Sequence, residues 1–220
     1  MNRDSDCYAI IPAAGKSERM GRAKLLLSWP TVTNQHATVL DRVLQAWTSS
    51  KVVRTIVVTR SDADSQIQQI CHSYPVDVIV ADDPYDMKES CRLGIQHISN
   101  NYSRDAIDRF FVCPADIPGI TSFVIDRLMR EAEIYQQSQT DRHSPIIVPT
   151  FRSKRGHPVL FPWTIVPEVL NLARDEGLNS LVNRAEVVEV EFSLSPETMQ
   201  DIDTPDDYAR AIRSLGKPQN

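Results

Sequence analysis

Strand-like and helix-like segments alternate over the first 135 residues of this 220-residue chain, and this rhythm leaves few folds open. Short apolar or β-branched runs predict buried strands, and apolar residues at helical spacing between them predict helices. The expected strands are residues 7–13, 55–59, 76–80 and 110–113, and the expected helices are 38–47, 61–72, 89–98 and 122–136. Thr121 is the expected cap of the last of these helices, and Ser61-Asp62 of the second. The pattern is typical of an α/β protein with a mostly parallel sheet and helices on both faces.

The second half of the chain departs from this regular alternation of strands and helices. Strands are expected at residues 146–148, 158–161 and 186–192, and helices at 165–172, 179–182 and 205–215. The spacing of these strands indicates an antiparallel element. Residues 136–144 are the best candidate for a linker, but they are few and no repeat accompanies them. We therefore expect one domain over residues 1–220.

Composition excludes several classes of protein. Lys and Arg number 24 against 29 Asp and Glu, a net charge of −5, which disfavours a nucleic-acid binder that relies on general positive charge. No apolar stretch approaches the roughly 20 residues of a membrane helix, and the first residues lack the apolar core of a secretory signal. The four cysteines form no C-x-x-C pair, so we expect reduced thiols in a cytoplasmic protein.

A basic loop follows the first expected strand, with the sequence A-A-G-K-S-E-R-M-G-R-A-K at residues 13–24. Residues 15–24 carry four cations and one acid, on a chain that is acidic overall. The small residues Ala13, Ala14 and Gly15 let main-chain N–H groups approach a ligand closely. Ligands of open parallel sheets bind at the carboxyl ends of the strands, so a polyphosphate site is expected here. The alternative is a solvated basic surface loop.

Two common phosphate loops do not match. A Walker loop requires glycine where this chain has Ile10, and the dinucleotide fingerprint requires glycine where it has Ala13.

The loop does resemble a family signature, and three further motifs follow it in order. They are D-I-P at residues 116–118, R-G-H-P at 155–158 and D-I-D-T-P-D-D at 201–207. Together they resemble the nucleotidyltransferases related to molybdenum cofactor cytidylyltransferase, whose loop reads L-A-A-G-x-S-x-R-M-G-x-x-K; here Pro12 replaces the leucine. The resemblance spans residues 8–208. It implies a Rossmann-like, mainly parallel mixed sheet with one reversed strand, and transfer of a nucleotidyl group to a phosphorylated acceptor with release of pyrophosphate.

The resemblance also implies the substrates. CTP is the expected donor and molybdopterin the expected acceptor, and the methyl group of Ala14 favours CTP because relatives that use GTP carry a second glycine there. A GTP donor, a sugar or alcohol phosphate acceptor, and a non-catalytic nucleotide-binding regulator are the alternatives. A molybdoenzyme or a second copy of the chain is a possible macromolecular partner.

The resemblance and the charges of the loop suggest roles for its residues. Lys24 would contact the phosphates, and Arg19 would hold the β and γ groups as a bidentate fork. Pro12, Ala13, Ala14, Gly15 and Ser17 would shape the nucleotide-binding loop. Little covalent chemistry is asked of the protein in such a transfer, because positioning and electrostatics carry the rate.

Mg²⁺ is the expected cofactor, held by Asp116 and Asp203. Asp201 is a rival for the second position. Asp116 could instead be a turn residue before Pro118, and Asp203 could be a helix N-cap.

The acceptor side is less well defined. Ser90 and His157 are the candidate acceptor-binding residues. Arg152, Lys154 and Arg155 form a second cationic cluster, either against the acceptor phosphate or at a solvated hairpin tip. Lys88 and Glu89 replace small hydroxyl residues of the family, a change expected to alter the polarity near the acceptor. Residues 30–37 also depart from the family pattern.

Overall fold

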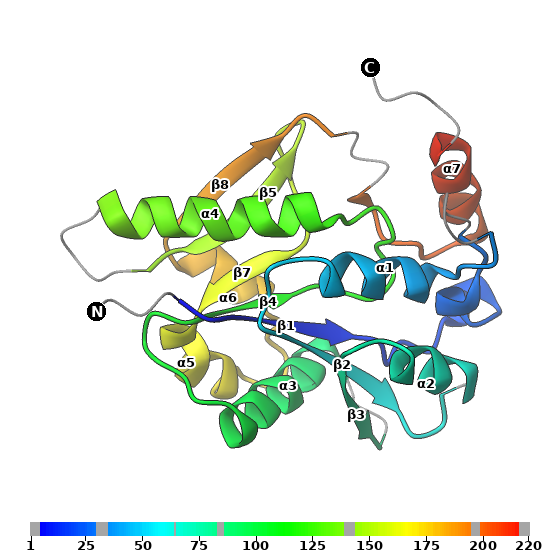
Figure 1. Ribbon diagram of the computed structural model, residues 1–220, viewed down its shortest axis with the longest axis horizontal. Helices are drawn as coiled ribbons and strands as arrows, with labels where there is room; N and C mark the ends of the chain where they lie inside the picture. Colours follow the sequence, from blue (N-terminus) through cyan, green and yellow to red (C-terminus); the bar gives the residue numbers. More distant parts are fainter. Residues whose placement is uncertain are drawn as a thin grey trace.

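The computed structural model describes residues 5–29, 35–63, 65–82, 86–138, 144–194 and 199–215 (Figure 1). Most of the divergent segment 30–37 and most of the candidate linker 136–144 lie outside these residues. At its first residues the linker segment is helical, because the helix before it continues to Ser138.

One sheet of eight strands forms the centre of the molecule. The strands are β1 (Cys7–Pro12), β2 (Arg54–Arg60), β3 (Asp77–Ala81), β4 (Arg109–Val112), β5 (Ile146–Phe151), β6 (Lys154–Arg155), β7 (Val159–Pro162) and β8 (Val187–Phe192). Their order is β3-β2-β1-β4-β7-β5-β6, and β8 pairs with β5. β1 pairs in parallel with β2 and β4, and β2 with β3. β7 runs antiparallel to β4 and β5, as does the short β6 to β5, whereas β8 is parallel to β5. The expected mainly parallel mixed sheet is thus confirmed, but two strands, β7 and the short β6, are reversed instead of the one expected.

Helices cover both faces of this sheet (Figure 1). α1 (Val39–Thr48), α2 (Ser65–His72), α4 (Ser122–Ser138) and α7 (Pro205–Leu215) contribute to the core on one face. α3 (Met87–Asn101), α5 (Val166–Leu170) and α6 (Asn179–Arg184) contribute to the core on the other. None of the helices within the described ranges is long and apolar enough to cross a membrane. All four cysteines are free and buried.

Several helix boundaries differ from those expected. Ser61 does not cap α2, because its N–H group donates to the carbonyl of Ala81 at the end of β3 (2.9 Å) and the helix begins only at Ser65. α3 begins earlier than expected, because the Asp86 carboxylate caps it by accepting the N–H group of Glu89 (2.8 Å). Thr121 does cap α4, through the N–H group of Val124 (3.3 Å). The expected helix 165–172 is a 3₁₀ turn, Trp163–Ile165, followed by the short α5.

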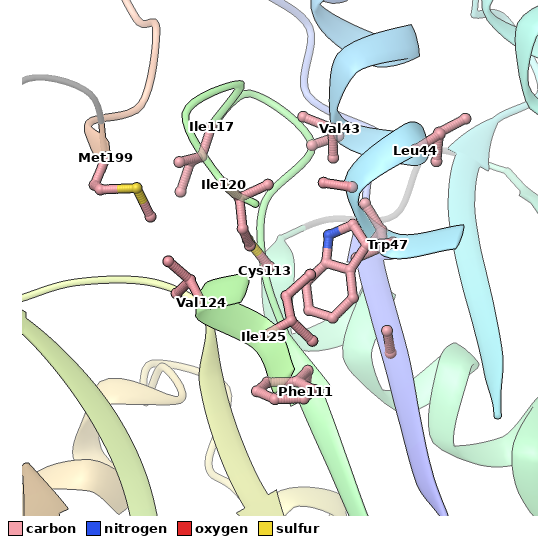
Figure 2. Packing of buried hydrophobic residues seen from close by; sticks show 14 of the residues in the cluster. Val43, Leu44, Trp47, Phe111, Cys113, Ile117, Ile120, Val124, Ile125 and Met199 are labelled. Atoms are coloured by element: carbon pink, nitrogen blue, oxygen red, sulfur yellow. The ribbon is translucent and has the colours of Figure 1, made fainter. Parts of the chain in front are cut away.

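The core between α1, α4 and β4 also supports the loop that leaves β4 (Figure 2). Trp47 of α1 packs edge-on against Phe111 of β4, with ring centroids 5.3 Å apart. Ile117 and Ile120 of the loop are almost fully buried in the same cluster. Burying an aliphatic side chain of this size contributes roughly 1.5–3 kcal/mol. These contacts hold the loop, and with it Asp116, in place.

Candidate active site

The site lies where the order of the strands reverses. The chain leaves β1 through α1 toward β2 on one side, whereas β4 pairs on the other side of β1 and follows a helix of the opposite face. Ligands of open α/β sheets bind at such a switch point, outside the carboxyl ends of the strands. A cavity of about 580 Å³ opens there. Its lining consists of Pro12, Ala13, Ala14, Gly15, Lys16, Ser17, Glu18, Arg19, Lys24, Leu25, Asp86, Met87, Ser90, Pro114, Ala115, Asp116 and Asp203.

The loop after β1 is anchored in the middle of its basic stretch and directly after it. Met20 and Leu25 are buried in the core and tie the loop to the fold. Ser17 and Gly21 adopt left-handed backbone conformations (φ 53° and 68°), and the Gly21 N–H group closes a 3₁₀ turn on Glu18. Lys24 then donates its main-chain N–H group to the Ser17 hydroxyl (3.2 Å). Ser17 thus stabilises this loop conformation through its left-handed backbone and its hydroxyl.

A main-chain hydrogen bond joins the two expected metal-binding segments. The N–H group of Ile202, which is buried, donates to the carbonyl of Asp116 (3.0 Å). Asp203, the next residue, thereby lies beside Asp116. The cap of α7 is Thr204, whose hydroxyl accepts the N–H group of Asp207 (3.2 Å) while the Asp207 carboxylate accepts the Thr204 N–H group (2.8 Å). Asp203 is thus not needed as a cap, and its carboxylate faces the cavity.

Lys24 connects the loop to both carboxylates. Its ammonium donates to Asp116 and to Asp203, the latter at 3.0 Å, and only 14% of its side chain is exposed. Arg19, whose side chain is 70% exposed, pairs with the other oxygen of Asp203 (2.7 Å). Five of the residues that the sequence singled out therefore meet at one point: Ser17, Arg19, Lys24, Asp116 and Asp203.

The charges of this cluster affect its protonation. Burial disfavours the charged form of Lys24, but Asp116 and Asp203 outweigh this effect and raise the pKa of its ammonium. Burial likewise opposes ionisation of Asp203, but the hydrogen bond and charge of Lys24, with the charge of Arg19, lower the pKa of that carboxyl. Burial and the neighbouring charges of Asp203 and Asp116 raise the pKa of Asp201. Of Asp201 and Asp203, Asp203 is therefore the carboxyl group that ionises more readily.

The carboxylates present a donor set of the kind that Mg²⁺ uses. The Oδ1 atom of Asp116 is buried and has no hydrogen-bond partner, which is costly for a carboxylate oxygen unless a cation or water completes the site. Within the described ranges no group of three or more His, Cys, Asp or Glu side chains is arranged to hold a metal. Mg²⁺ commonly takes only one or two protein carboxylates and completes its shell with water and phosphate oxygens. Asp116 and Asp203 fit that pattern.

The acceptor-side candidates separate in the structure. Ser90 lines the cavity, whereas His157 is not among the lining residues. The His157 ring is hydrogen-bonded to the main chain of Val112, and burial lowers its pKa in spite of the charge of Asp116. Arg155 pairs with Glu189 on β8 (2.7 Å).

The cationic cluster 152–155 is exposed: Arg152 lies in the turn between β5 and β6, and Lys154 and Arg155 form β6. Lys88 and Glu89 do not line the cavity either. The Lys88 ammonium is directed at carbonyls of residues 173–176, and Glu89 pairs with Arg92 (2.9 Å). The expectation that these two residues alter the polarity beside the acceptor is therefore wrong.

Asp86 and Met87 line the cavity and were not predicted as site residues. A signal for Asp86 was present: it follows the expected strand 76–80, and ligand-binding residues of parallel sheets follow strand ends. Met87 carries no such signal, because an apolar residue at a helix start is ordinary.

Comparisons with known proteins agree with this architecture. The chain is 23% identical over 207 residues to the molybdenum cofactor cytidylyltransferase of Escherichia coli (strain K12), covering 94% of each protein. A nucleotidyl transferase from Methanothermobacter thermautotroptrophicus superposes with a TM-score of 0.74 at 21% identity, covering 96% of this chain and 98% of that one. The manganese complex of Rv0371c from Mycobacterium tuberculosis superposes with a TM-score of 0.71 at 22% identity, covering 96% and 100%.

The family model described as a MobA-like NTP transferase domain matches residues 9–190. The matched residues include the basic loop after β1, Asp116 and Ser90, which lines the cavity. The chain is therefore a nucleotidyltransferase that belongs to the family of MobA-like NTP transferase domains.

Proposed function

We propose that this enzyme transfers CMP from CTP to a phosphorylated acceptor, molybdopterin, in a reaction that depends on Mg²⁺ and releases pyrophosphate. One observation carries the proposal: the ammonium of Lys24 contacts both Asp116 and Asp203 at the wall of a cavity that the glycine-containing loop also lines. Phosphate-binding cations and metal-binding carboxylates thus share one site. The similarity to a protein named molybdenum cofactor cytidylyltransferase supports this choice of substrates.

The proposed reaction is a substitution at the α-phosphorus. An oxygen of the acceptor phosphate forms a bond to that phosphorus, and the bond from it to the α–β bridging oxygen breaks. The electron pair of the broken bond leaves with pyrophosphate, so negative charge grows on the leaving group. Lys24 offsets this charge as a point cation, and Arg19, which is mostly exposed, swings onto the β and γ phosphates as a bidentate donor.

Asp116 and Asp203 would hold the metal ion. Bound Mg²⁺ would supply positive charge and orient the phosphate oxygens of the donor. The two carboxylates already face the cavity, and the free Oδ1 atom of Asp116 offers a lone pair without breaking an existing bond. Lys24 would exchange part of its contact with them for the donor phosphates.

The choice of CTP rests on the loop. The methyl group of Ala14 borders the cavity, where family members that use GTP carry glycine. Calorimetric titration with CTP, GTP, UTP and ATP in Mg²⁺ tests the choice, since a tenfold preference corresponds to about 1.4 kcal/mol. We expect CTP to bind best and Asp116→Ala to weaken it. If GTP binds best, the cytidylyltransferase proposal is wrong and the protein is assigned as a guanylyltransferase.

The choice of molybdopterin is tested by turnover. Pyrophosphate release from CTP is compared with molybdopterin and with sugar or alcohol phosphates as acceptors. Because Lys88 and Glu89 face away from the cavity, they give no reason to prefer the latter. Activity with a sugar phosphate alone would overturn the acceptor assignment, and nucleotide binding without turnover on any acceptor would indicate a regulator.

Lys24→Ala is expected to lose most pyrophosphate release while the fold survives. Lys51→Ala, which removes an exposed lysine outside the cavity lining, is the matched control. Ser90 is proposed to contact the acceptor, and a contact from His157 remains a prediction. The free thiols support a reducing compartment, so we propose a cytoplasmic location.

A further inference from the structure

Lys88 is an unusual residue of α3 because its charge is buried. The residue is only 8% exposed. Its ammonium donates three hydrogen bonds, to the carbonyl oxygens of Ala173 (2.6 Å), Arg174 (3.0 Å) and Glu176 (2.8 Å). An ammonium has three donors and no acceptor, so this arrangement uses its full bonding capacity.

The acceptors belong to a closed loop between α5 and α6. The Glu176 N–H group donates to the carbonyl of Ala173 (3.0 Å), and the Glu176 carboxylate accepts the Ala173 N–H group (3.1 Å). Arg184 of α6 holds the same carboxylate (3.1 Å). Three carbonyl oxygens converge on one point in this loop, and the three N–H donors of one ammonium satisfy them together.

Other residues of the same helical turn line the cavity. Asp86, Met87 and Ser90 line the cavity, and Lys88 lies between them in sequence. The Asp86 side chain caps the helix by accepting the N–H group of Glu89 (2.8 Å), and the Ser90 N–H group donates to the Asp86 carbonyl (3.2 Å), so these residues are joined by hydrogen bonds. A fixed contact at Lys88 therefore limits how far this wall can move.

We infer that Lys88 is a positioning residue: it acts as an internal cation that binds the carbonyls of the 173–176 loop and so fixes the cavity wall formed by Asp86, Met87 and Ser90. The loop is thus a small cation site that the chain fills with its own side chain. The inference rests on the proposed function only where substrate affinity is concerned.

The test uses Lys88→Ala in the full chain with chemical rescue by propylammonium, which replaces the missing part of the side chain. Amide hydrogen exchange is measured in residues 86–92 and 171–178. We expect exchange in both segments to rise at least tenfold, to fall back with propylammonium, and to be unaffected by tetramethylammonium, which has no N–H donor. Arg92→Ala, on the same helix, is the control and should leave exchange in the 171–178 loop unchanged.

A second readout addresses the cavity. For whichever nucleoside triphosphate the wild-type enzyme turns over, Lys88→Ala should raise KM severalfold with little change in kcat, and propylammonium should restore KM. If the wild-type protein binds no nucleotide, the proposed function fails while the exchange experiment still decides the role of Lys88.

Two results would overturn the inference: unchanged exchange in Lys88→Ala, or equal effects of propylammonium and tetramethylammonium. Should Lys88→Ala fail to fold, Glu176→Gln disturbs the loop from its other side. It is then expected to raise exchange in residues 86–92, and unchanged exchange there contradicts the role of Lys88.

Discussion

Replacement of Lys24 by methionine removes the ammonium that Asp116 and Asp203 share and keeps an unbranched apolar side chain in place of the methylene stem. The side chains of the three residues are 14%, 11% and 22% exposed. Removal of one partner from a buried ion pair costs about 3–5 kcal/mol. Since Asp203 keeps Arg19 and remains partly solvated, we expect about 2–3 kcal/mol. At roughly 2–4 °C per kcal/mol for a chain of this size, Tm should fall by about 4–12 °C.

The pH dependence of this loss has a defined sign. The pKa of Lys24 is raised in the folded protein. Its contribution to the free energy of unfolding is therefore complete below the ordinary lysine pKa of 10.5 and is lost as the pH rises through the folded-state pKa. The lowered pKa of Asp203 means that its contribution is present above the ordinary value of 3.8 and is lost as the pH falls through the folded-state pKa. The difference in stability between wild type and Lys24→Met should therefore be largest at neutral pH and shrink at both extremes.

Mg²⁺ should distinguish this variant further. Lys24 competes with a metal ion for the two carboxylates, so Mg²⁺ without nucleotide should raise the Tm of Lys24→Met more than that of the wild type. Pyrophosphate release should nevertheless fall by about 10²–10³-fold, the usual cost of losing one stabilising donor at a developing charge.

Thermal unfolding from below pH 3.8 to above pH 10.5, with Mg²⁺ added at neutral pH, checks these expectations beside a pyrophosphate assay. Lys51→Met is the matched control, because it removes an exposed lysine outside the cavity lining. An unchanged Tm, or equal stabilisation of both proteins by Mg²⁺, would refute the reasoning about the shared ammonium.

Three further variants test other parts of the structure. A methyl group at Gly15 meets nothing within 4 Å, so Gly15→Ala should change the unfolding free energy by no more than about 0.5 kcal/mol but weaken nucleotide binding about tenfold by calorimetry. A methyl group at Gly94 would lie 2.6 Å from Cγ2 of Ile10, so Gly94→Ala should cost about 1–3 kcal/mol in urea unfolding and cost less in an Ile10→Ala background. The lowered pKa of His157 predicts stability that is present above pH 6.5 and lost as the pH falls toward the folded-state value, with a slope of at most about 1.4 kcal/mol per pH unit. His157→Gln should flatten this dependence in urea unfolding at pH 5–7.

Each of these variants has an outcome that contradicts its premise. Wild-type nucleotide affinity in Gly15→Ala would mean that the ligand does not approach this glycine. Equal stability of Gly94→Ala and wild type would show that α3 can move away from β1. An unchanged pH slope in His157→Gln would place the titrating group elsewhere.

Much of the fold was predictable because its signals are local. The buried strands of the first half are short apolar or β-branched runs, and their length and composition predict them. β6 was missed because Lys154 and Arg155 are exposed and charged, and only pairing with β5 makes them a strand. The start of α2 was misplaced because the N–H group of Ser61 is taken by β3, a contact that propensity cannot anticipate.

The candidate site was likewise predictable from the sequence only in part. The basic loop at residues 13–24 is contiguous, so its composition, small residues and spacing could be read directly. The pairing of Asp116 with Asp203 could not be derived from spacing and was expected only from resemblance. It depends on the hydrogen bond from Ile202 and on the burial of Ile117 and Ile120.

Lys88 is the clearest example of a residue whose environment only the tertiary structure decides. In the sequence it is a charged residue near the start of an expected helix, where solvent exposure is the ordinary outcome. The residue pattern predicted the α/β class and the basic loop after the first strand, and the resemblance to a family predicted the two carboxylates. Only the tertiary structure decided that one lysine is shared by both carboxylates and that another is buried against three carbonyls. The physical reason is that periodicity and turn chemistry act over a few residues, whereas these contacts join segments far apart in the chain that only the packed core brings together.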